Sequence, residues 1–270
     1  MPYLCFNGVF SDVQKPVIPA ANKAYRYGDG FFETLRVHNA AIPLWNLHSS
    51  RILKSSALLS YAFAARVSPE RIYEEILDLC RMNHCSGSAR VRLSFSNGNG
   101  GLFERSELHY LIEAEPFVPL PDKELQLGIY DELQKEVHRF SGLKLAGGFI
   151  YSRAAQFCKQ QGWGDCVILN KDQQVIETSI SNLFWVKNGN IFTPPVTDGC
   201  VAGVFRSYLL TAEPGIAEQS CTLQTLKEAD ALLLTNALRC IRRVTRFDAK
   251  HYGDDQTAAL LCRHNQLLFS

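Results

Sequence analysis

Lys144 is the clearest candidate for chemistry in this sequence. It lies in Phe140-Ser-Gly-Leu-Lys-Leu-Ala-Gly-Gly148, where every neighbour is apolar or small. Burial in such a setting disfavours the charged form of an amine, and a neutral lysine can attack a carbonyl to form a Schiff base. The flanking glycines would let a bulky cofactor approach the backbone. The alternative is an ordinary lysine at a strand edge, with its stem on the core and its ammonium in water.

Distant segments add further groups that could act with this amine. Glu177 lies in Val175-Ile-Glu-Thr-Ser-Ile-Ser-Asn-Leu-Phe-Trp185, ahead of a predicted strand. The segment Tyr25-Arg-Tyr-Gly-Asp-Gly-Phe-Phe-Glu-Thr-Leu-Arg36 reads as a glycine turn that enters an alternating strand. Three shorter motifs complete the set: His48-x-x-Arg51, Thr193-Pro-Pro195 and Gly203-Val-Phe-Arg206.

In this order and spacing, the motifs resemble those of the class IV aminotransferases. This is the fold type IV group of pyridoxal phosphate enzymes, which includes branched-chain and D-amino acid aminotransferases and aminodeoxychorismate lyase. The resemblance extends from about Asn7 to Val244. It implies an α+β fold of two domains, with a smaller N-terminal α/β domain and a larger C-terminal domain built on a mixed, barrel-like sheet.

The resemblance also implies how pyridoxal 5'-phosphate would be held. Lys144 would supply the amine and move a proton, and Glu177 would keep the pyridine nitrogen protonated so that the ring can accept electrons. Arg51 would bind the phosphate, which favours a guanidinium and the N–H groups at a helix start. The remaining cofactor-binding candidates are Val204 and Phe205, through their backbone, and Thr235, Asn236 and Ala237 in a second phosphate loop. Many relatives have threonine at the position of Phe205, so one hydroxyl contact is missing here.

Substrate recognition is less sharply indicated. The positions that match the substrate side of the family are Tyr27, Phe32, Arg36 and Arg92. Aromatic residues at alternate strand positions are at least as often part of the core. Branched-chain enzymes usually have glycine where Thr34 stands and tyrosine where Phe149 stands. Lyases of the family often have Ser-Arg-Gly where this chain has Ser94-Phe95-Ser96, so Arg92 could replace that arginine only if its side chain faces the pocket.

Three functions are compatible with these motifs. The leading hypothesis is a class IV aminotransferase that moves an amino group between an amino acid and a 2-oxo acid. The alternative is a 4-amino-4-deoxychorismate lyase, which would release pyruvate and 4-aminobenzoate. A minor alternative is a pyridoxal phosphate-binding protein without catalysis, because of Phe205 and the altered Ser94-Phe95-Ser96.

The composition favours an enzyme that acts on a small molecule. The 270 residues are 46% hydrophobic and 20% charged, with a formal net charge of +1 and no long basic run. We therefore expect no nucleic-acid or membrane partner. The N-terminus lacks the pattern of a signal peptide, which predicts a cytoplasmic protein. The family resemblance implies a homodimer. No metal is expected, and the nine cysteines, without any Cys-x-x-Cys, are predicted to be free buried thiols.

Proline spacing predicts the domain boundary. Pro116-Phe-Val-Pro-Leu-Pro121 removes three backbone donors in six residues, which is typical of a linker. We predict an N-terminal α/β domain over residues 1–115, a linker over 116–122 and a C-terminal cofactor-binding domain over 123–270. Within the first domain, Tyr3 to Phe10 is predicted as one strand, and Asn46 to Ser60 as a helix capped by Asn46.

Overall fold

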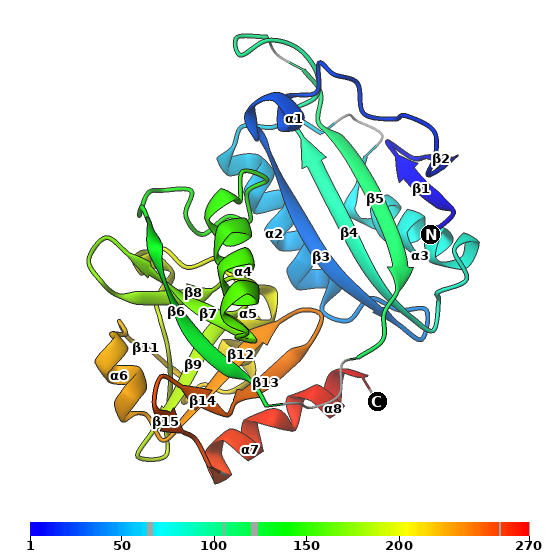
Figure 1. Ribbon diagram of the computed structural model, residues 1–270. Coiled ribbons are helices and arrows are strands. Elements are labelled where there is room, and N and C mark those ends of the chain that lie inside the picture. Colours follow the sequence, from blue (N-terminus) through cyan, green and yellow to red (C-terminus); the bar gives the residue numbers. More distant parts are fainter. Residues whose placement is uncertain (64–66, 105, 120–123, 254, 270) are drawn as a thin grey trace. The chain divides into compact units, whose positions relative to one another are not determined.

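The computed structural model describes residues 1–63, 67–104, 106–119, 124–253 and 255–269. The chain forms two compact units, which are coloured along the sequence in Figure 1. Unit 1 comprises Met1–Pro119 and Lys144–Gly147, and unit 2 comprises Leu120–Leu143 and Gly148–Ser270. The segment around Lys144, which we expected in the C-terminal domain, thus belongs to unit 1. Residues 120–122 of the predicted linker lie outside the described residues. No described helix is long and apolar enough to cross a membrane.

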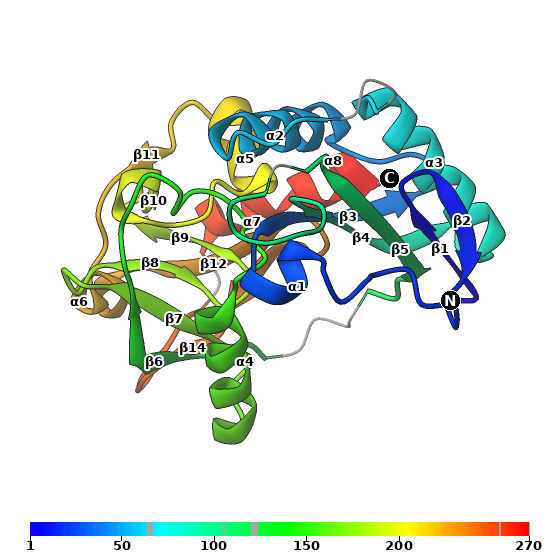
Figure 2. The ribbon, with the colours of Figure 1, turned by 90° about the horizontal axis from the view of Figure 1, so that it is seen from above.

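Unit 1 is a five-stranded antiparallel sheet with helices packed on it. The strand order is β2-β1-β5-β4-β3. The elements are β1 (Tyr3–Phe6), β2 (Val9–Asp12), α1 (Lys23–Tyr27), β3 (Gly30–His38), α2 (Trp45–Leu58), α3 (Pro69–Met82), β4 (Ser88–Ser96) and β5 (His109–Pro116). Helices α2 and α3 cover one face of the sheet, as Figure 2 shows from above.

The alternation of side chains in β3 and β4 separates a structural face from a chemical one. Leu35, Val91 and Leu93 point into the core between the sheet and its helices and are fully buried. The residues between them, including Phe32 and Arg92, lie on the opposite face, because successive strand residues point to opposite sides. The long strand pairing from Gly30 to His38 fixes this register.

Two local expectations for unit 1 are wrong. The predicted strand from Tyr3 to Phe10 is a hairpin, because Asn7 and Gly8 both adopt positive φ and the chain turns back there. The predicted cap Asn46 lies inside α2, and Leu44 in the left-handed region is the N-cap, without a side-chain hydrogen bond. A sharp backbone turn therefore starts this helix, where we expected a polar side chain.

Unit 2 contains two five-stranded mixed sheets, in the orders β15-β14-β6-β7-β8 and β11-β10-β9-β12-β13. The strands are β6 (Gln126–Lys135), β7 (Asp165–Asn170), β8 (Val175–Thr178), β9 (Asn182–Lys187), β10 (Asn190–Thr193), β11 (Ala217–Glu218), β12 (Ala231–Asn236), β13 (Cys240–Val244), β14 (Arg246–Phe247) and β15 (Lys250–His251). The helices are α4 (Phe149–Gln161), α5 (Val204–Ala212), α6 (Leu223–Glu228), α7 (Gln256–Cys262) and α8 (His264–Phe269), with a 3-10 turn at Val196–Asp198.

The two sheets of unit 2 enclose a common apolar core, which gives the barrel-like arrangement. Leu127 and Val167 of one sheet belong to the same buried cluster as Trp185 and Leu232 of the other. On the outer face of the first sheet, α4 packs against β6 and β7. A second buried cluster, which includes Ile168 and Ile176, fills this contact.

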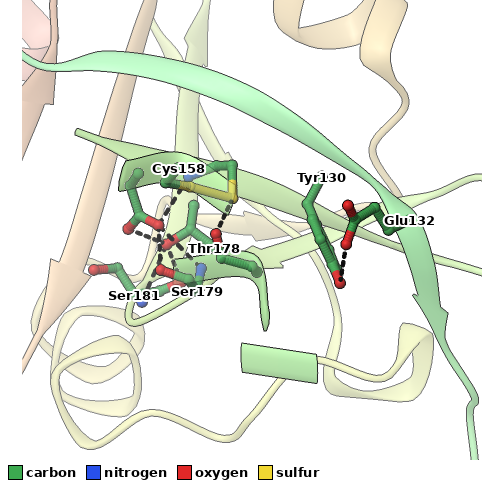
Figure 3. The surroundings of a disulfide bond; sticks show 9 residues. Tyr130, Glu132, Cys158, Thr178, Ser179 and Ser181 are labelled. Carbon is green, nitrogen blue, oxygen red and sulfur yellow. Dashed lines mark hydrogen bonds between the residues drawn. A yellow bond between two sulfur atoms is a disulfide. The ribbon is translucent and has the colours of Figure 1, made fainter. Parts of the chain in front are cut away.

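The expectation of nine free thiols is wrong for one pair. Cys158 of α4 and Cys166 of β7 form a disulfide, with 6.2 Å between their Cα atoms. Figure 3 shows Cys158 near Thr178, the last residue of β8, and Ser179, which follows it. The pairing arises because α4 packs directly on β7, and an eight-residue separation carries no recognisable sequence signal. Of the other seven cysteines, six are buried.

Candidate active site

Lys144 is held against the edge of strand β3. The N–H of Phe32 donates to the carbonyl of Lys144 at 2.9 Å, and the N–H of Ala146 donates to the carbonyl of Gly30 at 2.9 Å. Leu145 and Phe31 form an isolated bridge between these bonds. The backbone of the lysine is therefore fixed by sheet-like pairing, and its half-buried side chain lies beside the sheet.

The side chains of Lys144 and Arg92 contact the same aromatic ring. The Nζ atom of Lys144 lies 4.5 Å from the ring centroid of Phe32, and Cζ of Arg92 lies 4.0 Å from it. Arg92 also donates from Nε to Oγ of Ser94 at 3.1 Å. Burial lowers the pKa of Arg92, so its surroundings disfavour the charge that a guanidinium nevertheless keeps. Three of the predicted residues thus meet in unit 1.

Arg51, the predicted phosphate ligand, is paired with a buried carboxylate. Its Nε and Nη2 atoms donate to the two carboxylate oxygens of Glu33, both at 2.6 Å. Nδ1 of His48 lies 2.8 Å from the same carboxylate. Glu33 and His48 are each only 1% exposed. The His48-x-x-Arg51 motif therefore fixes α2 to β3 through Glu33, which the sequence did not single out, and the orientation of the guanidinium is set by this bidentate pair.

The buried carboxylate of Glu33 should make the protein sensitive to acid. Burial alone would raise its pKa, but Arg51 and His48 lower the pKa of Glu33 to about 2. Because the folded-state pKa is depressed, its stabilisation is present above the unfolded value and is lost as the pH falls from about 4.3 toward 2. We expect Glu33→Gln to lose about 3 kcal/mol of stability at pH 7 and much less near pH 2.

Urea-unfolding midpoints of wild type and Glu33→Gln, measured between pH 7 and pH 2, test this expectation. Glu115→Gln is the matched control, because Glu115 forms an exposed pair with Arg90 at 2.9 Å. It should change the midpoints little at any pH. A wild-type to Glu33→Gln difference that does not shrink on acidification would contradict the role of this carboxylate.

Glu177 is buried in unit 2 and accepts from three donors. Its Oε1 atom accepts from Nζ of Lys135 at 2.9 Å and from the hydroxyl of Tyr151 at 2.7 Å. Its Oε2 atom accepts from the N–H of Val201 at 2.9 Å. A carboxylate offers about four acceptor positions, so one remains, on Oε2. This is what a carboxylate needs in order to accept one further N–H.

Two breaks in strand register orient the side chains of Glu177 and Lys135. Along β7 and β8, Ile168 pairs with Glu177 and Leu169 pairs with Val175, so Ile176 is an extra residue that turns Glu177 toward the face covered by α4. Along β6, the register breaks after Tyr130 and resumes at Lys135. Such bulges re-aim a side chain without ending the strand, and sequence periodicity does not predict them.

The groups around Glu177 stay neutral or cationic. Burial and the charge of Glu177 raise the pKa of Tyr151 far above its ordinary value, so its hydroxyl remains a donor. The same two causes raise the pKa of the Cys200 thiol to about 12. Lys135 is the charge partner of Glu177, and its Nζ also donates to the carbonyl of Ser141 at 3.2 Å. An ammonium engaged in this way is a poor nucleophile, which leaves Lys144 as the candidate amine.

The segment that leads into helix α5 contacts Glu177, because Val201, whose N–H donates to that carboxylate, lies two residues before the helix N-cap. Gly203 is its N-cap, and no side chain caps the helix. A Cβ atom at Gly203 would lie 1.9 Å from Oδ1 of Asn182, so only glycine fits here. Arg206 is buried and fixes α5 by donating to the carbonyl of Pro194 at 2.8 Å. Uncapped N–H groups at a helix start favour an anion such as phosphate.

The other predicted phosphate residues have different surroundings. Val204 and Phe205 are buried, and the ring of Phe205 packs on Tyr208, so only their backbone is available, as expected. The hydroxyl of Thr235 is buried and lacks a hydrogen-bond partner among the described residues. The side-chain oxygen of Asn236 instead accepts from the N–H groups of Leu238 and Arg239 and holds the turn that contains Ala237.

The predicted substrate residues divide into two pairs. Phe32 and Arg92 line a cavity of about 220 Å³ in unit 1. Tyr27 and Arg36 are not among the residues that line it. Tyr27 ends α1 and is exposed, and Arg36 stacks on Phe117, 5.2 Å from its ring centroid. Alternation along β3 places Arg36 on the same face as Phe32, but Arg36 lies four residues further along the strand and does not line the cavity.

One group of side chains has the composition of a metal site. Among the described residues, Cys158, Asp165 and Cys166 are the only three potential ligands found close together. The two sulfur atoms are bonded to each other. The carboxylate of Asp165 accepts from the hydroxyls of Thr178 and Ser179, at 2.7 and 2.6 Å. Asp165 therefore supports the end of β8, the strand that contains Glu177.

Comparison with known proteins identifies the family of this chain. A family model described as amino-transferase class IV matches residues 30–247, so the chain belongs to the class IV aminotransferase family and is an enzyme of that family. It is 27% identical to an aminodeoxychorismate lyase from Vibrio harveyi, over 92% of this chain and 94% of that protein.

Solved structures confirm the expected α+β, fold type IV architecture. A branched-chain aminotransferase from Thermoproteus uzoniensis, solved with norvaline, has a TM-score of 0.89 at 19% identity and covers 98% of this chain and 93% of its own. A hypothetical aminotransferase from Mycobacterium tuberculosis, in its PLP-bound form, has a TM-score of 0.83 at 17% identity and covers 99% and 98%.

Proposed function

We propose that this protein is a pyridoxal phosphate-dependent aminotransferase that moves an amino group between an amino acid and a 2-oxo acid. The observation that carries the proposal is the buried carboxylate of Glu177, which accepts from Lys135, Tyr151 and the N–H of Val201. Val201 in turn lies two residues before Gly203, the N-cap of helix α5. The segment from Val201 to Gly203 thus connects a carboxylate that could pair with a ring nitrogen to a helix start that could bind a phosphate.

The residues fit this cofactor in three further respects. The hydroxyl of Thr235 is buried without a partner, Gly203 permits close backbone approach, and α5 presents uncapped N–H groups. The assigned cofactor-binding set is Arg51, Lys144, Glu177, Val204, Phe205, Thr235, Asn236 and Ala237. When bound, pyridoxal phosphate supplies an electron sink for the bonds around the substrate Cα.

The chain's own groups perform the remaining tasks. Lys144 holds the cofactor covalently and then accepts and returns a proton at the substrate Cα. Glu177 holds the proton at the ring nitrogen. Arg51 and the N–H groups of Val204 and Phe205 bind and orient the phosphate. Tyr27, Phe32 and Arg36 are assigned to the substrate side.

The second candidate is 4-amino-4-deoxychorismate lyase. The similarity to the Vibrio harveyi lyase supports it. The run Ala89-Arg-Val-Arg-Leu93 also resembles lyases of this family. Phe149 is 68% exposed and no tyrosine stands there, which counts against a branched-chain specialist. Both reactions use Lys144 and Glu177 in the same way, and they differ in whether the substrate carries a leaving group at Cβ.

Two assays on the same purified enzyme separate these functions. The first follows conversion of 2-oxoglutarate to glutamate with a panel of L- and D-amino acids. The second follows release of pyruvate and 4-aminobenzoate from 4-amino-4-deoxychorismate. Turnover in the first assay alone supports the aminotransferase, turnover in the second alone replaces it with the lyase, and turnover in neither contradicts both. A cytoplasmic location and a homodimer remain predictions.

A further inference from the structure

We propose that Arg92 binds a carboxylate group of the substrate, and that the apolar body of that substrate occupies the adjacent cavity of unit 1. The inference rests on the proposed function, because it assigns the substrate class of the same reaction. Arg92 would take the role of the arginine that is absent from Ser94-Phe95-Ser96. The substrate would be a carboxylate carried on an apolar or ring-shaped body.

The first argument is a contrast between two arginines of β4. Arg90 pairs in register with Glu115 of β5, and the two side chains form an exposed ion pair at 2.9 Å. Arg92 pairs in register with Glu113 in the same way. Yet among the described residues Arg92 has no carboxylate partner, and its side chain turns to Ser94 and to the ring of Phe32. Of the two cross-strand pairs, Arg90 and Glu115 form an ion pair, whereas Arg92 and Glu113 do not.

The second argument is the position of this open guanidinium. Stacking on Phe32 and the bond from Nε to Ser94 fix its plane, while its terminal nitrogens remain available. Glu113 acts on Arg92 electrostatically, but among the described residues no carboxylate forms an ion pair with this half-buried cation. A bidentate carboxylate is the ligand that best matches a guanidinium. Because Lys144 contacts the same ring, a substrate bound at Arg92 extends toward the reactive amine.

The third argument is the cavity itself. Its volume of about 220 Å³ exceeds the roughly 150 Å³ that admits benzene in an engineered protein cavity. Aromatic and aliphatic residues such as Phe6, Phe32 and Leu111 form most of its wall. His109 also lines it, and the buried Nδ1 of His109 has no hydrogen-bond partner among the described residues. An apolar space with one cation and one open polar atom suits an aromatic or apolar carboxylate.

Binding of benzoate and of benzamide to the purified holoenzyme tests this inference. The two probes have nearly the same shape, but only benzoate is charged. We expect wild type to prefer benzoate, and Arg92→Gln to weaken benzoate at least about tenfold while changing benzamide less than about twofold. Arg90→Gln, on the same strand and face, should leave both affinities unchanged.

Arg92→Lys keeps the charge but loses the planar fork, so it should retain a reduced preference for benzoate. It also tests the idea if Arg92→Gln does not fold. The inference is overturned if wild type does not distinguish the probes, if Arg92→Gln loses both equally, or if Arg90→Gln has the same effect. None of these readings depends on turnover. Failure of the proposed function would appear separately, as a purified protein without bound pyridoxal phosphate.

Discussion

Lys144→Ala is expected to abolish the visible absorption band of lysine-bound pyridoxal phosphate and to reduce turnover by about a thousandfold or more. The side chain supplies both the covalent anchor and the proton-transfer group, and a positioned acid–base group alone contributes about 10² to 10⁴ in rate. The backbone of residue 144 bonds to β3 through its carbonyl, which alanine keeps. The variant should therefore fold normally by circular dichroism.

Lys171→Ala is the matched control for this variant. Lys171 is exposed and forms a surface pair with Glu136, so its loss should leave both the band and the rate intact. Normal turnover in Lys144→Ala would show that another amine serves the reaction. Lys135 would then be the first to test, because it is largely buried and pairs with Glu177.

Glu177→Gln is expected to lower kcat by more than about tenfold, which corresponds to about 1.4 kcal/mol in the barrier. The amide keeps the shape of the side chain but cannot hold a proton on the ring nitrogen by its charge. The structure adds a second effect. The substitution leaves the ammonium of Lys135 without its carboxylate, and breaking a buried pair costs about 3 to 5 kcal/mol, with the lower end expected because Lys135 is 12% exposed.

The double variant Lys135→Met/Glu177→Gln separates these two effects. It removes the unpaired charge, so stability should return toward the wild-type value, whereas the rate should stay low. Steady-state kinetics at saturating cofactor and urea unfolding measure the two quantities. Recovery of the rate together with stability would mean that Glu177 acts only through folding. A kcat within tenfold of wild type in Glu177→Gln would remove it from the ring nitrogen.

The sequence predicted the chemical groups better than their partners. Lys144 and Glu177 were singled out as candidates because motifs fix their types and order. Lys135, Tyr151 and Glu33 were missed, although each contacts a predicted residue. The first two reach Glu177 through breaks in strand register and a helix packing on a sheet, and these long-range contacts leave no local periodicity. Glu33 could have been found, because alternation places it on the core face of β3, where a lone carboxylate needs a partner.

Fold predictions succeeded where side-chain alternation was regular. Strand β3 follows the expected alternation closely. The prediction failed at Asn7, where a turn signal inside an apolar run was overlooked, and at Leu44, where backbone geometry starts the helix. The pairing of Cys158 with Cys166 depends on the packing of α4 against β7. This packing is a tertiary contact, which a single sequence does not display.

Borohydride reduction of the purified enzyme, followed by peptide mapping with mass spectrometry, tests the central claim most directly. Reduction fixes pyridoxal phosphate permanently to the amine that carries it. The account predicts one phosphopyridoxyl label per chain, on the peptide that contains Lys144, and none on Lys135, which is paired with Glu177. A label on Lys135 or elsewhere, or no label on enzyme saturated with pyridoxal phosphate, would contradict it.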